Sequence, residues 1–569
     1  MAKSDLQGIR KILNEETPYF EERADYIEKS QLLEWTAKGD FFEKIQKKLI
    51  GLGAKLLVGP RGTGKTHQMR CAYYSCLDNK EAPLPIYVSF NRYLRLEAYL
   101  SKTSNAIDIF HSWVLAKIVI EIAEEHDISL DMFSFNLSQL KQFVDESERQ
   151  IERSEHDLII AEISVESVKQ YIGCALGASG RRRAILLLDD AALTLTHDYM
   201  IEFFDIFRSL KSTNISPKAS VYPGTTQYGP RFHIGHDAEV VPAWLNVDDS
   251  GYTKFMDVLL TKRIHEEVEV PKDIMELLKY ASFGVPRAFI MMLREYSESD
   301  RGTAQAKYNA VLQQRKESVL AEYKSIGQKV PQFSKIIDSG EYFFLETVEQ
   351  LRLHNYQNIE KKGGDYKKTI IVGLTEIPSR ADRMFQFLVE AGLLHELQDV
   401  SHGSDRRTIR FIPHLAILLQ ARIFTKSRGF NASEIAKILN GKSEKHPMRR
   451  SFYSLLSEDQ VNEIALNLPP CANCSASRIS EKQKFCHNCG KVLVEVSAFE
   501  SCMKTPLQDL PLTAFQKNAI KKHTKFKTVE DVLTCQDPAT ELKKAEGIGA
   551  AYAERIFLKV NSWVDEFLV

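Results

Sequence analysis

The residues whose types and spacing most clearly suggest chemistry form a glycine-rich loop. In order, the loop consists of Gly59, Pro60, Arg61, Gly62, Thr63, Gly64, Lys65 and Thr66. The apolar run at 55–58 before it predicts a buried strand, and the stretch from His67 predicts the first turns of a helix. Strand, glycine-rich loop and helix are the context of a phosphate-binding loop (P-loop), because glycine lets backbone N–H groups approach an anion.

The expected ligand of this loop is ATP with Mg²⁺, bound by residues 59–66 together with His67. Lys65 would reach the β- and γ-phosphates, and the hydroxyl of Thr66 would coordinate Mg²⁺. A chance match to a glycine-rich turn is the alternative, and the flanking strand and helix weigh against it.

Two carboxylates, Asp189 and Asp190, end the apolar run at 184–188. The carboxyl ends of parallel strands lie on the ligand side of a sheet, so both side chains are expected near the P-loop. Asp189 would hold Mg²⁺, and Asp190 would be the base that polarises the attacking water. The alternative is an ordinary buried strand followed by a turn.

With both motifs in place, residues 45–425 resemble AAA+ ATPases of the initiator type, which includes the archaeal and eukaryotic origin-recognition ATPases. The resemblance implies ATP hydrolysis, action on DNA, and assembly with further copies of the chain or with related ATPase subunits. It also implies that Thr225 or Thr226 senses the γ-phosphate. Arg231 would be an arginine finger, and Arg287 would be a second sensor of that phosphate; a surface salt bridge is the alternative for either arginine.

One departure from the family leaves a second function open. Most AAA+ enzymes have glutamate where this chain has Asp190, and the shorter side chain predicts slow hydrolysis. Signal-transducing NTPases often carry two aspartates there and a Gly-x-Pro-x-Ala motif, which residues 284–288 also match. The alternative is therefore a nucleotide switch that recruits an effector protein, for example in bacterial antiviral defence.

Four cysteines predict a metal site near the C-terminus. They form two C-x₂-C pairs with eleven residues between the pairs, namely Cys471, Cys474, Cys486 and Cys489. Four thiolates close a tetrahedral Zn²⁺ site without an open position, so the zinc is expected to be structural. The spacing resembles a zinc ribbon, and iron in a rubredoxin-like site is the minor alternative.

Two further segments resemble DNA-binding modules. A predicted helix ending at Gly392 and a hairpin through Thr408–Phe411 resemble a winged helix, with Arg406, Arg407 and Arg410 at the wing. Two predicted helices joined by Gly547-Ile548-Gly549 resemble a helix-hairpin-helix, whose backbone N–H groups can contact DNA phosphates. A packing module and a protein-docking module are the respective alternatives. Lysines cluster before the second segment, at Lys517, Lys521, Lys522, Lys525 and Lys527.

The length of 569 residues requires several domains. We expect a multidomain α/β protein whose P-loop parallel sheet forms an AAA+ core, followed by a helical lid, a winged helix, a zinc ribbon and a small all-α domain. The expected boundaries are an N-terminal helical segment at 1–45, the core at 46–250, the lid at 251–315, a winged-helix-like domain at 316–430, a helical connector at 431–468, the zinc ribbon at 469–500 and a helix-hairpin-helix-like domain at 503–569.

The composition says little about which partner the protein binds but more about where in the cell it is expected. The net charge is −1, from 75 basic and 76 acidic residues, so any DNA-binding surface has to be local. No apolar run approaches the length of about 18 residues that a membrane span needs, and the first residues are polar. We therefore expect a cytoplasmic protein without a membrane partner.

Overall fold

The computed structural model describes residue 24 and residues 27–568, except for 91–92, 98, 152, 191–196, 225, 227, 265–268, 364–365, 402–406, 427–430, 442, 445, 480–482, 484, 494–501, 511, 536 and 546–547. Thr225, Arg406, Gly547 and residues 1–23 of the expected N-terminal helical segment therefore lie outside the described residues. No helix within the described residues is both long and apolar enough to span a membrane.

A five-stranded parallel sheet forms the centre of the first domain, in the order β2-β3-β4-β1-β5. The strands are β1 (Lys55–Val58), β2 (Leu84–Ser89), β3 (Ala184–Asp189), β4 (Ile215–Val221) and β5 (Glu239–Pro242). The predicted parallel α/β core is therefore confirmed. Because all strands run the same way, the P-loop after β1 and the carboxylates at the end of β3 meet at one edge of the sheet.

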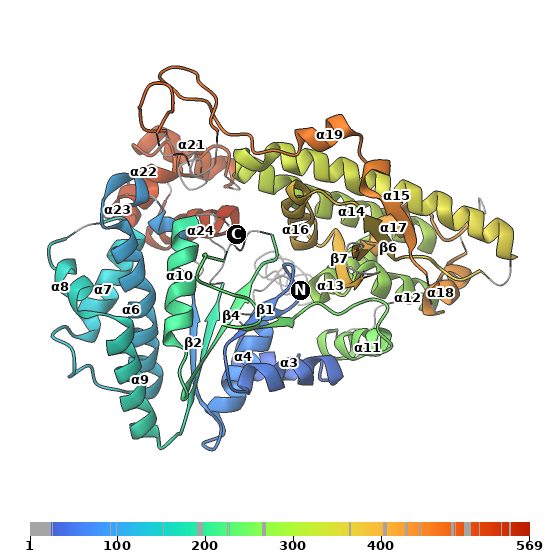
Figure 1. The fold of residues 1–569 in the computed structure, drawn as a ribbon. Coiled ribbons are helices and arrows are strands. Elements are labelled where there is room, and N and C mark those ends of the chain that lie inside the picture. Colours follow the sequence, from blue (N-terminus) through green and yellow to red (C-terminus); the bar gives the residue numbers. More distant parts are fainter. Residues whose placement is uncertain are drawn as a thin grey trace, which may run out of the picture.

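Helices cover both faces of this sheet (Figure 1). Successive side chains of a strand point to opposite faces, and Leu56 and Leu57 of β1 accordingly belong to two different apolar clusters. The helices that cover the sheet are α3 (Asp40–Ile50) and α4 (Lys65–Leu77) on one face, with α6 (Ala106–His126) and α10 (His197–Leu210) on the other. The short α2 (Lys29–Glu34) packs against α4, where Arg70 donates a hydrogen bond to the carbonyl of Ile27.

A helical insertion lies between β2 and β3. Its elements are η2 (Tyr93–Leu96), α5 (Tyr99–Lys102), α6, α7 (Leu137–Glu148), α8 (His156–Glu162) and α9 (Val165–Ser179). The helices expected at 251–315 are also present, as α11 (Tyr252–Arg263), α12 (Lys272–Ala281), α13 (Pro286–Glu298) and α14 (Ala304–Lys329). Because α14 runs on past residue 315, one continuous helix joins this helical segment to the next domain.

The next domain contains a second sheet, in the order β7-β8-β6-β9. Its strands are β6 (Val372–Thr375), β7 (Leu394–Ser401), β8 (Arg407–Pro413) and β9 (Met448–Ser451). Its helices are η3 (Pro331–Phe333), α15 (Ser334–Lys362), η5 (Ser379–Ala381), α16 (Asp382–Glu390), α17 (Leu415–Gln420), α18 (Ala432–Asn440), η6 (Phe452–Ser454) and α19 (Glu458–Glu463). The expected helix and hairpin are present as α16, β7 and β8, with β7 and β8 antiparallel.

One expectation for this domain is corrected. The connector at 431–468 is not wholly helical, because it contains β9, which pairs in parallel with β6. Arg410 lies on the expected hairpin, within β8, opposite Leu397 of β7 and Gly373 of β6, and its Nε is buried.

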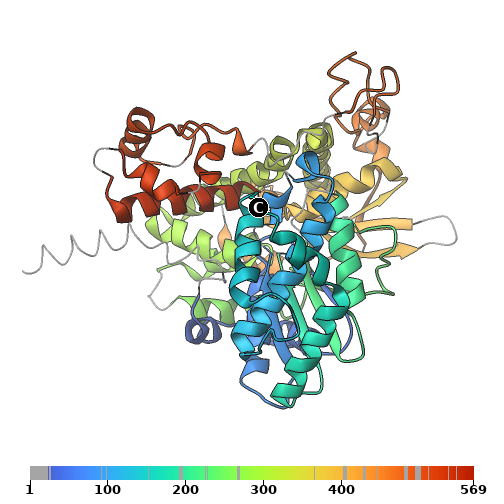
Figure 2. The ribbon, with the colours of Figure 1, turned by 90° about the vertical axis from the view of Figure 1, so that its left-hand side faces the viewer.

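The C-terminal helices are α21 (Ala514–His523), α22 (Val529–Leu533), α23 (Pro538–Leu542) and α24 (Ala550–Leu568). Figure 2 shows this unit seated beside the domain of the first sheet. Its apolar residues share one cluster with the helices that cover the first sheet. Arg95 donates a hydrogen bond to Asn561 at 2.8 Å, and Arg149 donates one to the carbonyl of Cys535 at 3.2 Å.

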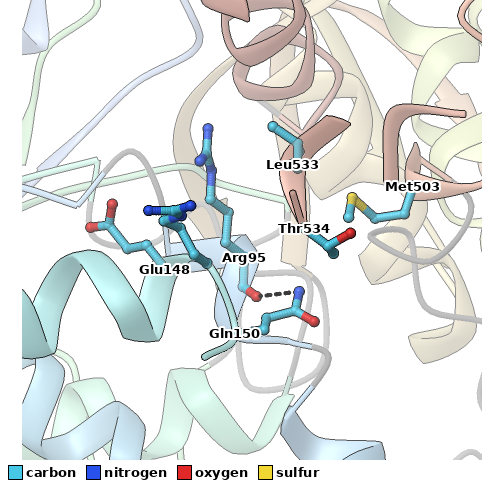
Figure 3. Close-up of a pocket in the computed structure, with 7 residues that line it drawn as sticks. Arg95, Glu148, Gln150, Met503, Leu533 and Thr534 are labelled. Atoms are coloured by element: carbon cyan, nitrogen blue, oxygen red, sulfur yellow. Dashed lines mark hydrogen bonds between the residues drawn. The ribbon is translucent and has the colours of Figure 1, made fainter. Parts of the chain in front are cut away.

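A small pocket marks this junction (Figure 3). It lies between the helical insertion, which contributes Arg95, Glu148, Arg149 and Gln150, and the C-terminal unit, which contributes Met503, Leu533 and Thr534. The side chain of Gln150 donates a hydrogen bond to the carbonyl of Arg95 within it. The C-terminal unit is therefore docked on the insertion by both apolar and polar contacts.

Candidate nucleotide-binding site

The glycine-rich loop lies between β1 and α4, as the sequence predicts. Gly64 caps α4 in the left-handed region, with φ of 87°, a conformation that glycine adopts without the strain of a Cβ atom. A Cβ built on Gly62 would lie 3.0 Å from Val285 and 3.4 Å from Arg287. The loop is therefore closed on one side by the start of α13, and Arg287 lies directly against it.

Lys65 is buried beneath the loop. Its Nζ donates hydrogen bonds to the carbonyls of Gly59 at 2.7 Å and Pro60 at 3.1 Å. The ring of Tyr222 lies 3.8 Å from the same Nζ. Burial lowers the pKa of Lys65 to about 7, although the nearby carboxylates of Asp190 and Asp189 act in the opposite direction. An anionic ligand would strengthen the charged form of this lysine.

Asp189 is almost fully buried at the end of β3 and is held by two side chains. Ser220 of β4 donates a hydrogen bond to its Oδ1 at 2.6 Å, and Tyr87 of β2 donates one to its Oδ2 at 2.9 Å. The backbone N–H of Asp190 donates to Ser220 Oγ and to Asp189 Oδ1. These contacts orient Asp189 at the sheet edge where the P-loop lies.

Asp190 follows β3 in an unusual conformation. Its φ is 51°, in the left-handed region where aspartate is one of the few residues that occur regularly. Its side chain is also buried. Its carboxylate raises the pKa of Lys65, whereas burial lowers it. Asp190 and Lys65 are therefore close enough to interact electrostatically.

The remaining predicted residues occupy different places. Thr226 accepts a hydrogen bond from the N–H of Tyr222 at 3.0 Å and so closes the turn after β4. Arg231 lies on the surface, with its side chain 73% exposed and 3.3 Å from Asp205 of α10. His67 contacts the hydroxyl of Thr36 at 3.0 Å rather than the loop, and burial lowers its pKa to about 3. His67 is therefore neutral.

Residues that sequence reasoning missed also line this edge. Ser220 lies within β4 and Tyr222 directly after it, and Ser216 and Lys218 of the same strand are polar too, so the sequence does not distinguish Ser220. Glu390 of α16 accepts a hydrogen bond from the N–H of Gly224 at 2.8 Å. The two residues are 166 positions apart, and no local sequence pattern links them.

The four cysteines come together in a separate module. Their sulfur atoms all lie within 4.8 Å of one another, with Cys471 and Cys489 at 3.6 Å and Cys474 and Cys486 at 3.5 Å. A tetrahedron with Zn–S bonds of about 2.3 Å requires S···S distances of about 3.8 Å. Each C-x₂-C segment forms a tight turn. The N–H of Ser475 donates to the carbonyl of Cys471, and the N–H of Gly490 donates to the carbonyl of Cys486. The cluster fits a single Zn²⁺.

The basic residues expected at the C-terminus are accessible. Lys521, Lys522, Lys525 and Lys527 are exposed, and Lys517 is half-buried. Gly549 is exposed as well, and a Cβ built on it would meet no atom within 4 Å. The backbone at Gly549, directly before α24, is therefore accessible to a partner.

Comparison with known proteins finds structures but no sequence relatives. No family model and no curated protein matches this sequence. A Walker-type ATPase of Pyrococcus abyssi is similar with a TM-score of 0.36 and 14% identity, over 67% of this chain and 95% of the other. The ORC1 protein of Aeropyrum pernix, solved in complex with DNA, is similar with a TM-score of 0.27 and 12% identity, over 69% and 96%.

A third similar structure is the Drosophila ORC bound to DNA, with a TM-score of 0.27 and 13% identity, over 74% of this chain and 100% of the other. Because all three scores lie below 0.5, the function of this chain has to be inferred from its own geometry.

Proposed function

We propose that this protein binds ATP with Mg²⁺ at the edge of the parallel sheet and that the bound nucleotide controls its contact with DNA. The observation that carries the proposal is the convergence of the P-loop with Asp189, Asp190 and Arg287 at one edge. Cations and a Mg²⁺-binding carboxylate are the groups that a nucleoside triphosphate requires.

Two features of the loop fit a nucleotide. Among the described residues, the hydrogen bonds of Lys65 Nζ go to carbonyls of its own loop, so phosphate oxygens can replace these neutral acceptors and form stronger, charge-assisted bonds. Nδ1 of His67 is buried and has no hydrogen-bond partner among the described residues, so a polar atom beside the loop is available to a ligand. Thr66 and Asp189 would hold Mg²⁺.

Hydrolysis is proposed to be slow. Water would attack the γ-phosphoryl group of ATP, and Asp190 is proposed to orient that water. Aspartate is one methylene shorter than the glutamate usual in AAA+ enzymes, so its oxygens extend less far from the backbone. Arg287 and either Thr225 or Thr226 are proposed to sense the γ-phosphate.

DNA is proposed as the partner because the exposed lysines of the C-terminal unit lie in one short segment. Lysines attract phosphates at any sequence, and the open backbone at Gly549 offers N–H groups to the same oxygens. We infer that the hairpin of β7 and β8, with α16, belongs to a winged-helix-like module, and that the cysteine module is a zinc ribbon. Both would add to a contact without sequence preference.

Assembly is proposed to place Arg231 at a junction between subunits. An arginine finger acts on the site of a neighbour, so it has to be exposed in the single chain, as Arg231 is. Sedimentation velocity with a slowly hydrolysed ATP analogue tests this: association that Arg231→Ala weakens supports the junction, and a strict monomer contradicts it.

The test of the proposed nucleotide site is the substitution Lys65→Ala, with Lys80→Ala as the matched control. Lys80 is exposed on the same domain. Labelled ATP should bind the wild type and the control but not Lys65→Ala, while all three keep the same circular-dichroism spectrum. Equal ATP affinity in the three proteins would exclude this site. If ATP binds but DNA does not, the effector-recruiting switch is preferred.

A further inference from the structure

The last residue of α16 reaches into the nucleotide site from a different domain. Glu390 is only 6% exposed, and its Oε2 accepts the hydrogen bond from Gly224 N–H. Gly224 lies in the turn after β4, two residues beyond Tyr222, whose ring covers Lys65. A carboxylate of the second sheet domain is therefore buried next to the P-loop.

This approach depends on glycine at position 224. A Cβ built there would lie 2.8 Å from the carbonyl oxygen of Gln386 and 2.8 Å from Oε2 of Glu390. The carbonyl belongs to the helix backbone and cannot turn away. Any larger residue would therefore push α16 off the turn, and the contact between the two domains is as close as a backbone permits.

The charged groups around Glu390 are those of the nucleotide site. Burial lowers the pKa of Lys65, and the negative charges of Asp190, Asp189 and Glu390 raise it. Burial raises the pKa of Tyr222, and the same three carboxylates act in the same direction. The charge of Glu390 also acts to raise the pKa of Lys329 at the end of α14, which burial and Arg61 lower to about 8, and which Glu322 also faces. Glu390 therefore interacts electrostatically with Lys65 and Lys329, and Arg61 acts on the same two lysines.

A nucleoside triphosphate brings a further negative group to the same cations. Like charges at close range in a buried site repel each other, and a diphosphate lacks the terminal group. We propose that Glu390 determines nucleotide specificity by disfavouring ATP relative to ADP, and that ATP releases α16 from Gly224. This inference rests on the proposed ATP site. It gives the second sheet domain a position that depends on the bound nucleotide.

The first experiment distinguishes the effect of the negative charge of Glu390 from the effect of its shape. Glu390→Gln keeps an oxygen that can accept from Gly224 but removes the charge, and Glu349→Gln on α15 is the control carboxylate, paired with Arg352. Calorimetry with Mg²⁺ and either ADP or the imido analogue of ATP gives both affinities. The ratio of ATP-analogue to ADP affinity should rise about tenfold in Glu390→Gln and stay unchanged in Glu349→Gln.

The second experiment follows the contact itself by hydrogen exchange at the Gly224 turn and at α16. In the wild type, the ATP analogue should increase exchange in both segments, and ADP should not. Gly224→Ala should show faster exchange in both segments even without nucleotide. Its ratio of ATP-analogue to ADP affinity should rise as it does in Glu390→Gln. An unchanged ratio in Glu390→Gln, or weaker binding of the ATP analogue, would overturn the proposal. If neither ADP nor the ATP analogue binds to the wild type, the proposed nucleotide site itself would be rejected.

Discussion

Lys65 determines the first prediction at the scale of single residues. Because burial lowers the pKa of Lys65 to about 7, the side chain loses its charge as the pH rises through neutrality in the free protein. Bound phosphate restores the charged form, so binding takes up a proton above this pKa. ATP affinity should therefore fall by up to about tenfold per pH unit between pH 7.5 and 8.5.

Calorimetry in buffers of different ionisation enthalpy measures the proton uptake directly. Lys65→Arg is the control, because arginine stays charged throughout this range. It should show no uptake if it binds ATP. A pH-independent affinity in the wild type would mean that Lys65 is fully charged before ATP binds.

The second residue prediction concerns Asp190. Asn is the replacement of choice, because asparagine also tolerates the left-handed backbone that Asp190 adopts. Asp190→Asn should leave ATP binding intact and lower turnover about a hundredfold or more, the usual effect of losing a general base. A phosphate-release assay with and without DNA measures this. Turnover equal to the wild type would remove Asp190 from the reaction.

At the scale of elements, the zinc module offers a local test. The module has a small core of its own, made largely of the four cysteines, so the metal should supply much of its folding free energy. Metal analysis should find about one Zn²⁺ per chain. Cys474→Ser should lose it and expose residues 471–493 to protease, while ATP binding persists. A metal-free protein with this segment still protected would contradict the site.

The lysines around α21 give the second prediction at this scale. Truncation is a poor test, because the C-terminal unit shares its apolar cluster with the nucleotide domain. Charge removal by Lys521→Gln, Lys522→Gln and Lys525→Gln together is cleaner. Duplex DNA affinity should fall, and the log–log salt slope should flatten by about 0.9 for each lost phosphate contact. The same triple change at Lys44, Lys47 and Lys80, also exposed, should have little effect.

Elements are predictable where the sequence pattern is strong. β3 is an apolar run up to Asp189 and is buried at every position, so its hydrophobicity predicts it, whereas β4 also contains Ser216, Lys218 and Ser220 and has a weaker pattern. The strands β6 and β9 have four residues each, and β9 contains Arg449 and Arg450, so neither has a distinctive pattern. The pairing of β9 with β6 depends on the tertiary structure, and the sequence around β9 therefore predicts helix instead of strand.

At the scale of the whole molecule, the contacts between distant segments escape prediction. The sequence indicates the P-loop and the two carboxylates, because each is a local pattern. It does not indicate that Glu390 meets Gly224, or that Arg95 meets Asn561. These contacts join the nucleotide domain to the second sheet domain and to the C-terminal unit. They are the physical connections by which bound nucleotide is proposed to affect DNA contact.

The central claim is that nucleotide at the P-loop changes DNA affinity. The most direct measurement is the duplex DNA affinity, at one salt concentration, with no nucleotide, with ADP and with a slowly hydrolysed ATP analogue, in the wild type and in Lys65→Ala. Coupling energies between sites are typically 1–3 kcal/mol, about 5- to 150-fold in affinity. The wild type should bind DNA with affinities that differ at least about fivefold between the ADP and ATP-analogue states, and Lys65→Ala should show one affinity throughout. Equal affinities in all three states of the wild type would contradict the claim.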